Sequence, residues 1–527
     1  MVEGWSPTLL VGLNSAFMLQ RLPRLSRPTA PDPIRQDLFG DDGRFRRWVL
    51  AFLAANVVVG LLLRTVAIGQ ESLWYDEAAS MKMAAASPSQ IFSGEVFDAG
   101  NPPLYFILLG WWCDVFGHTI EAARWFAAVC GAVTCVPTWL LCMSVGFHRR
   151  LAVIATTLVT INPALVYLGR EARTFTLAAT LVTVLAYVAI RLVRRTRMID
   201  WCLFFLCGTA LVFLHYYSLF LMIIISLPIL AGRRRHLHKT LPALSLVAAA
   251  MFVPFMFWMP MFVKQMSIWS APDVPWWKHA LYFPVYVVGG RTFVWKQDGL
   301  MWMGAAFGLV LFGVLIPVIA GLRRSPRSIG VPLIVGVGLA AVAVMMSVLK
   351  EPMFNCRYLA PTIPCLIVAA VVSIAWLHQS HRWVAPMAGG IAFCVPLVAI
   401  PRIFLETQKN DWRGVAMHVE AAGDAAMPIA FRSDIGELSY RYYDPDRERI
   451  ELRSDFQPES KSDRMDRYRK QLADDGEFWV AHCMPAPESS VPPAQRWLEY
   501  YFDLVERHEF RGITLERYRT PADSETR

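Results

Sequence analysis

Residues 174–192 read TFTLAATLVTVLAYVAIRL, an almost uninterrupted apolar run. A helix needs roughly 20 such residues to cross the hydrocarbon core of a bilayer, so this run predicts a transmembrane helix. Arginines follow it at positions 194, 195 and 197, and the charged segment GREAR at 169–173 precedes it. The two ends therefore differ: one is strongly basic, and the other carries an acid between arginines.

Apolar runs of similar length recur from residue 48 to residue 400, separated by short polar breaks. The chain is 55% apolar and 18% charged, whereas an average soluble protein is about 25% charged. This composition excludes a disordered chain and argues against a purely soluble enzyme. We expect eleven spans, at residues 48–68, 123–146, 151–168, 174–192, 201–214, 217–231, 241–262, 300–320, 330–349, 361–377 and 384–400.

Residues 102–116 (PPLYFILLGWWCDVF) are apolar but only 15 residues long. If they formed a span, the later arginine clusters would face outward. If they do not, the clusters at 149–150, 191–197 and 233–235 lie on the same side as Arg44. The positive-inside rule favours the second arrangement. We therefore expect 102–116 to be a helix at the outer interface, with the basic ends in the cytoplasm.

This topology divides the chain into three parts. We expect a cytoplasmic tail at 1–45 and a membrane domain at 46–404, with a large outer loop at 69–120. Residues 405–527 are charge-rich and contain short β-type runs, which predict a small soluble α/β domain outside the membrane. The fold class is thus a multi-pass α-helical membrane protein with a C-terminal α/β domain. The net charge of +9 then marks cytoplasmic loops and does not indicate nucleic-acid binding.

Within the C-terminal domain, two kinds of segment are expected. The strands are predicted at Ile429–Arg432, Phe478–His482 and Ile513–Tyr518, and the helices at Asp434–Tyr443 and Ala494–Tyr501.

The polar break after the first span carries two adjacent acids. The segment SLWYDE at 72–77 places Asp76 and Glu77 directly after aromatic residues. An acid in such partly dry surroundings suits a general base or a metal ligand. Acids in the first turn of a helix also interact favourably with the helix dipole without any further function, and the residues alone leave both interpretations open.

Two further breaks on the same predicted side carry arginine. Glu171 lies between Arg170 and Arg173, which either pair with the acid or bind a phosphate in bidentate fashion. Arg357 and Tyr358 stand at the outer end of a later span, where arginine suits an anionic headgroup or only reaches toward the interface. Acids and arginines together on one membrane face suit a reaction on a lipid-linked phosphate.

Five segments in order resemble the GT-C glycosyltransferases. They are SLWYDEA (72–78), NPPLYFILLGWW (101–112), REARTF (170–175), RYLAP (357–361) and KNDWRG (409–414). The resemblance covers roughly residues 48–415 and is greatest to the bacterial branch related to protein O-mannosyltransferases and lipid A aminoarabinose transferases. It implies an inverting transfer from a polyprenyl-phosphate-linked sugar donor. The acceptor would be a lipid, a polysaccharide or a protein on the outer face of the cell inner membrane.

The resemblance also implies roles for individual residues. Asp76 matches the catalytic base, and Glu171 matches an acid that helps hold a divalent metal ion such as Mg²⁺ or Mn²⁺, with Asp76 as a further ligand. The residues matched to substrate binding are Arg357, Tyr358, Arg173 and Glu77. The family often has a charged residue or a histidine before the PP pair, whereas this chain has Asn101.

Two other classes of function fit a multi-span chain. A transporter or flippase of lipid-linked sugars is the first, but such proteins tend to show repeated halves and charges at mid-span, and neither pattern is present in the sequence. A membrane-anchored sensor is the second, although the C-terminal domain shows no cluster of acids, histidines or cysteines typical of a site. Glycosyl transfer is therefore the leading hypothesis.

Overall fold

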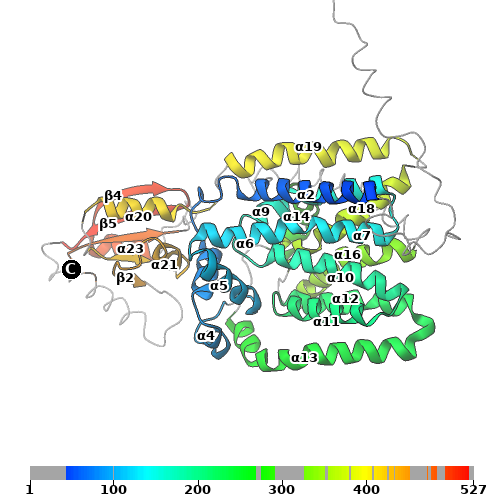
Figure 1. Ribbon diagram of the computed structural model, residues 1–527. Coiled ribbons are helices and arrows are strands. Elements are labelled where there is room, and N and C mark those ends of the chain that lie inside the picture. The colour runs from blue at the N-terminus through cyan, green and yellow to red at the C-terminus, as the bar shows by residue number, and fades with distance from the viewer. Residues whose placement is uncertain are drawn as a thin grey trace, which may run out of the picture.

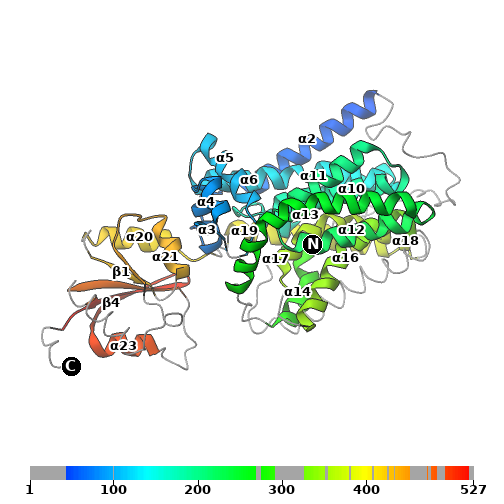
Figure 2. The same cartoon turned by 90° about the horizontal axis from the view of Figure 1, so that it is seen from below.

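The computed structural model consists of a helical bundle and a five-stranded sheet that lies beyond one end of it (Figures 1 and 2). The described residues are 43–98, 100–268, 275–290, 326–349, 354–378, 381–405, 409–423, 427–431, 434–451, 472, 476–483 and 493–521.

Seven helical segments in this part of the chain are long and apolar enough to cross a membrane: Gly43–Thr65, Ile120–Val145, Phe175–Arg194, Arg234–Ile268, Gly330–Leu349, Cys356–Ala375 and Val384–Leu405. They contain α2 (Gly43–Thr65), α6 (Ile120–Val133), α7 (Cys135–Val145), α10 (Phe175–Arg194), α13 (Leu237–Ile268), α16 (Pro326–Leu349), α17 (Cys356–Leu359), α18 (Ile363–Leu377) and α19 (Val384–Leu405). Shorter bundle helices are α8 (Arg149–Thr160), α9 (Pro163–Leu168), α11 (Met198–Val212), α12 (Tyr217–Gly232) and α14 (Trp276–Gly289). The multi-pass fold is confirmed.

The predicted number of eleven spans is not confirmed by the described residues. The run at 300–320 lies outside them, and the run at 151–168 is not one helix. It is divided into α8 and α9 because Pro163 has no N–H to donate, and the Asn162 side chain caps the new helix by accepting from Leu165 N at 3.1 Å. The runs at 201–214 and 217–231 form α11 and α12, of 15 and 16 residues.

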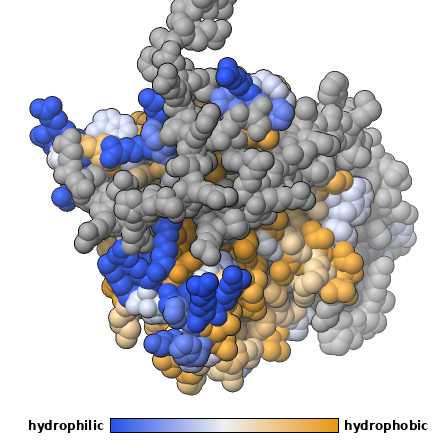
Figure 3. All heavy atoms as spheres, turned by 90° about the vertical axis from the view of Figure 1, so that its right-hand side faces the viewer, coloured by the Kyte–Doolittle hydropathy of each residue, from blue (hydrophilic) through white to orange (hydrophobic). Residues whose placement is uncertain are grey.

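The two ends of the bundle differ in charge. At the end remote from the sheet, α10 ends in Arg191 and Arg194, α12 is followed by Arg233, and α2 begins (Figure 1). Exposed residues at this end include Arg44, Arg47, Arg149, Arg197, Arg234 and Lys239. Figure 3 looks onto this end and shows hydrophilic side chains gathered beside a hydrophobic flank. This distribution agrees with the predicted cytoplasmic side.

The predicted outer loop lies at the opposite end, next to the sheet (Figures 1 and 2). It contains α3 (Tyr75–Ala84), α4 (Pro88–Ser93) and α5 (Leu104–Phe116). Residues 102–116 therefore form a helix, as predicted.

The C-terminal sheet has the order β2-β1-β3-β5-β4. β1 is parallel to β2 and β3, and β5 is antiparallel to β3 and β4. Its elements are α20 (Trp412–Ala421), β1 (Ile429–Phe431), α21 (Asp434–Arg441), β2 (Arg449–Glu451), β3 (Glu477–His482), α23 (Pro493–Tyr501), β4 (Asp503–Phe510) and β5 (Ile513–Arg519). The three predicted strands and both helices are confirmed. β2 and β4 were not predicted. β4 is an edge strand in which half of the residues are charged and none is fully buried, so it lacks the apolar run of a buried strand.

Hydrogen bonds attach the sheet domain to the outer loop. The Ser72 hydroxyl donates to Asp411 at 2.9 Å. The hydroxyl of Tyr443 accepts from the backbone N–H of Leu73 at 2.7 Å, and the Arg413 guanidinium donates to the carbonyl of Gly69 at 3.0 Å. Side chains of the C-terminal domain therefore satisfy backbone groups at the entrance to α3.

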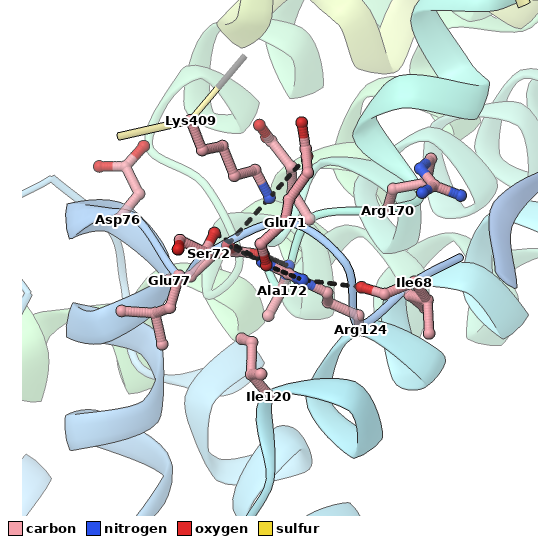
Figure 4. A network of polar contacts seen from close by, with 12 residues as sticks. Ile68, Glu71, Ser72, Asp76, Glu77, Ile120, Arg124, Arg170, Ala172 and Lys409 are labelled. Atoms are coloured by element: carbon pink, nitrogen blue, oxygen red, sulfur yellow. Dashed lines mark hydrogen bonds and ion pairs between the residues drawn. The ribbon is translucent and has the colours of Figure 1, made fainter. Parts of the chain in front are cut away.

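Glu77 links three parts of the chain from a fully buried position (Figure 4). Its carboxylate accepts from Arg124 of α6 at 2.7 and 2.8 Å, from Lys409 at 3.0 Å, and from the backbone N–H of Ala172 at 3.1 Å. Burial alone would raise the pKa of Glu77, but the charges and hydrogen bonds of Arg124 and Lys409 lower it to about 2. The carboxylate is therefore ionised and holds α3, α6, the loop before α10 and the C-terminal domain together.

Replacing Glu77 by Gln is expected to lower the free energy of unfolding by about 3 kcal/mol, because it removes the nearest counter-charge of two buried cations, Arg124 and Lys409. Since the pKa of Glu77 falls from its ordinary value of 4.5 to about 2 on folding, its stabilising contribution is complete above pH 4.5 and is lost as the pH falls toward 2. Denaturation of the purified protein in detergent, followed by tryptophan fluorescence at several pH values, measures both effects.

The control for this experiment is Glu95→Gln, because Glu95 is an exposed acid of the same loop. It is expected to unfold like the wild type. Equal stability of Glu77→Gln and Glu95→Gln would contradict the structural role of Glu77.

Candidate active site

Asp76 is the second residue of α3 and stands beside the Glu77 network with its carboxylate apart from it (Figure 4). The side chain is 28% exposed, whereas that of Glu77 is fully buried. Two neighbouring acids thus have different surroundings, and only Asp76 is accessible to a substrate.

Arg357 joins Asp76 to Glu171. Its Nη1 lies 3.2 Å from Asp76 Oδ2, and its Nη2 lies 2.5 Å from Glu171 Oε2. The rings of Trp74 and Phe175 lie near the same guanidinium, at 4.6 and 5.1 Å from its central carbon. The cation is therefore held between aromatic rings, with a carboxylate at each terminal nitrogen.

Local structure explains why Arg357 is well placed. It is the second residue of the short helix α17, which the side chain of Asn355 caps by accepting from Arg357 N at 2.9 Å. Glu171 is in the tight connection between α9 and α10, and its side chain is only 1% exposed. Its second oxygen, Oε1, is buried without a hydrogen-bond partner among the described residues.

A second ion pair lies next to the first. Arg173 Nη1 lies 3.1 Å from Asp98 Oδ2, and it also donates to the backbone carbonyl of Asp76 at 3.1 Å. Burial alone would lower the pKa of Arg173, but Asp76 and Asp98 raise it above the usual value. Arg173 is therefore a charged group that fixes the start of α3.

Asp98 is a site residue that the sequence analysis did not single out. Its Oδ1 accepts from Asn101 Nδ2 at 2.8 Å and from Gly100 N at 2.9 Å, and Gln265 of α13 donates to its backbone carbonyl. Asn101 therefore orients Asp98, although the Asn101 side chain is itself uncharged. The only sequence signal was an acid three residues before an Asn-Pro pair.

Tyr358 belongs to a group of aromatic side chains beside Arg357. Its ring packs against Phe175 at 6.3 Å and against His215 and Tyr217 at 5.3 and 5.4 Å between centroids. These rings form a wall next to Arg357. The structure thus brings together Asp76, Glu171, Arg173, Arg357 and Tyr358, all predicted from the sequence, and adds Trp74, Phe175 and Asp98.

The two acids matched to a metal site, Asp76 and Glu171, do not form a suitable ligand set. Both bind the guanidinium of Arg357, which already supplies the positive charge between them. A divalent ion such as Mg²⁺ takes about six oxygen ligands in octahedral geometry. No group of three or more His, Cys, Asp or Glu side chains suited to a metal occurs within the described ranges. These residues fit a guanidinium better than a metal ion.

The arrangement combines an accessible carboxylate with two arginines at one end of the bundle. Such a carboxylate can accept a proton, and a partly buried guanidinium can stabilise the negative charge of a leaving phosphate. Glu171 and Asp98 are buried and hold the guanidinium groups of Arg357 and Arg173 in place.

Comparisons with known proteins concern part of the sequence and the fold. Residues 100–258 match the family model described as dolichyl-phosphate-mannose-protein mannosyltransferase. No curated protein matches the chain.

Three solved structures resemble the fold. ArnT from Cupriavidus metallidurans in the apo state has 12% sequence identity and a TM-score of 0.58, over 89% of this chain and 98% of ArnT. ArnT bound to undecaprenyl phosphate has 11% identity and a TM-score of 0.53 over the same shares of both chains. The Archaeoglobus fulgidus oligosaccharyltransferase in complex with Zn and sulfate has 14% identity and a TM-score of 0.51, over 81% of this chain and 67% of that chain. The chain therefore shares its fold with these structures, and its residues 100–258 resemble the mannosyltransferase family.

Proposed function

We propose that this protein transfers a sugar from a polyprenyl-phosphate-linked donor to an acceptor on the outer face of the cell inner membrane. The observation that carries the proposal is Arg357, held between the carboxylates of Asp76 and Glu171 beside the charged Arg173. The match to a lipid-phosphate-dependent family and to the ArnT structure with undecaprenyl phosphate supports this class of donor.

In the proposed reaction, Asp76 acts as the general base. It accepts the proton of an acceptor hydroxyl or amine while that oxygen or nitrogen forms a bond to the anomeric carbon of the sugar. The bond from this carbon to the phosphate oxygen breaks, and the phosphate leaves with the bonding electron pair. Attack opposite the leaving group inverts the configuration at the anomeric carbon.

The arginines stabilise the leaving phosphate. Arg357 takes the negative charge that develops on the phosphate, and Glu171 keeps the guanidinium oriented from its buried side. Arg173 adds positive charge and fixes the backbone of Asp76. Tyr358 belongs to the aromatic wall next to Arg357 and is assigned to the donor side of the site.

Glu77 receives a different role from the one its motif implies. Its oxygens bind Arg124, Lys409 and the N–H of Ala172, and the side chain has no exposed area. We therefore propose that it positions Asp76 and the loop of Glu171 and does not touch the substrate.

The charge distribution supports the proposed orientation of the protein in the membrane. The basic end of the bundle would face the cytoplasm, and the candidate site and the C-terminal domain would face outward. A flippase is less favoured, because the acids and arginines of the site gather at one end of the bundle and do not form a path through it.

Asp76→Asn is expected to lower sugar transfer by about 10²–10⁴-fold, because the amide cannot accept the proton in the transition state. The measurement is transfer of labelled sugar from polyprenyl phosphate in membrane vesicles, normalised to the amount of protein. Glu95→Gln is the control, since this exposed acid of the same loop stands outside the site. Transfer by Asp76→Asn at the wild-type rate would refute the assignment of the base.

Chelation with EDTA is expected to leave the transfer rate unchanged, because Arg357 already supplies the charge between Asp76 and Glu171. The same vesicle assay, with and without EDTA, checks this expectation. A large loss of rate that Mg²⁺ or Mn²⁺ restores would show that the two acids hold a metal ion after all.

A further inference from the structure

We propose that the donor phosphate releases Asp76 for catalysis by taking its place on Arg357. This inference rests on the proposed function and concerns the regulation of the same site. Asp76 Oδ2 accepts from the guanidinium of Arg357, so one oxygen of the proposed base is already engaged. A phosphate that binds Arg357 competes for this contact and leaves the carboxylate free to accept a proton.

The geometry around Arg357 leaves few ways for an anion to approach it. Trp74 and Phe175 lie near the guanidinium, and its Nε is buried without a partner among the described residues. The two terminal nitrogens are bound by Asp76 and Glu171. A phosphate that binds these two terminal nitrogens therefore competes with the carboxylates for the positive charge of Arg357.

The two carboxylates are unequal, and this decides which one is displaced. The contact with Glu171 is 2.5 Å long, and the Glu171 side chain is 1% exposed. The contact with Asp76 is 3.2 Å long, and the Asp76 side chain is 28% exposed. An exposed ion pair is worth little, whereas breaking a buried pair is costly. The phosphate is therefore expected to replace Asp76, and Glu171 remains as the anchor.

Exchange requires little movement of the backbone. The carbonyl of Asp76 accepts from Arg173 at 3.1 Å and from the Ser80 hydroxyl at 2.9 Å, so the first turn of α3 is fixed independently of the side chain. Rotation of the Asp76 side chain is enough to turn the carboxylate from Arg357 toward an acceptor. This mechanism makes donor binding precede activation of the acceptor.

The test compares the binding of undecaprenyl phosphate to the full-length wild type and to Asp76→Asn in detergent. Because the variant lacks the competing negative charge, it is expected to bind at least about fivefold more tightly, although it does not catalyse transfer. Asp76→Ser, a smaller neutral variant, is expected to change affinity in the same direction. Equal or weaker binding by both variants would overturn the inference.

The matched control is Glu71→Gln. Glu71 is an acid of the same loop whose carboxylate lies 3.8 Å from Lys409. Its replacement removes one negative charge near the site and is expected to leave the affinity for undecaprenyl phosphate within about twofold of the wild type. Equal tightening by Glu71→Gln and Asp76→Asn would show a general charge effect and would overturn the exchange.

Two further probes separate the headgroup from the lipid chain. Undecaprenol, which lacks the phosphate, is expected to bind the wild type and Asp76→Asn equally. Inorganic phosphate alone is expected to bind Asp76→Asn more tightly than the wild type. Tighter binding of undecaprenol to the variant would overturn the inference. A wild type that binds neither undecaprenyl phosphate nor inorganic phosphate would instead refute the proposed function.

Discussion

The structure of the candidate site depends on one buried negative charge. Glu77 has no exposed area, and an ionised carboxylate in such a place is tolerated only if cations and N–H groups surround it. Arg124, Lys409 and the backbone of Ala172 meet this requirement from three distant parts of the chain. Because any shift of these partners leaves a charge unpaired, the carboxylate fixes their relative positions. The loop of Glu171 and the start of α3 are thereby brought to one place.

The same constraint explains why two adjacent acids behave differently. Successive residues of an α-helix point about 100° apart, so Asp76 cannot share the pocket of Glu77. Glu77 faces Arg124 inside the protein, whereas Asp76 faces Arg357 and is partly exposed. The buried Glu77 thus helps to keep the proposed base, Asp76, in position.

Hydropathy predicts most of the bundle, because lipid leaves few alternatives to an apolar helix. It failed at 151–168, where Asn162 and Pro163 end one helix and begin another inside a single apolar run. Asp76, Glu171 and Arg357 were predicted from residue type, side of the membrane and the resemblance. Asp98 was not, because its importance comes from Arg173, which is 75 residues away in sequence. A local sequence pattern cannot reveal an ion pair between residues that only tertiary packing brings together.

The boundary between the membrane domain and the C-terminal domain is less sharp in the structure than the composition suggests. Composition places it at residue 404, yet Lys409 is buried and belongs to the network of Glu77 in the outer loop. Four residues later, Arg413 donates to the carbonyl of Gly69, and Tyr443 accepts from Leu73 N. The C-terminal domain therefore completes the hydrogen bonding of the loop that carries Asp76. Since unpaired buried groups are costly, these contacts stabilise the loop in its observed conformation, and the domain supports the candidate site.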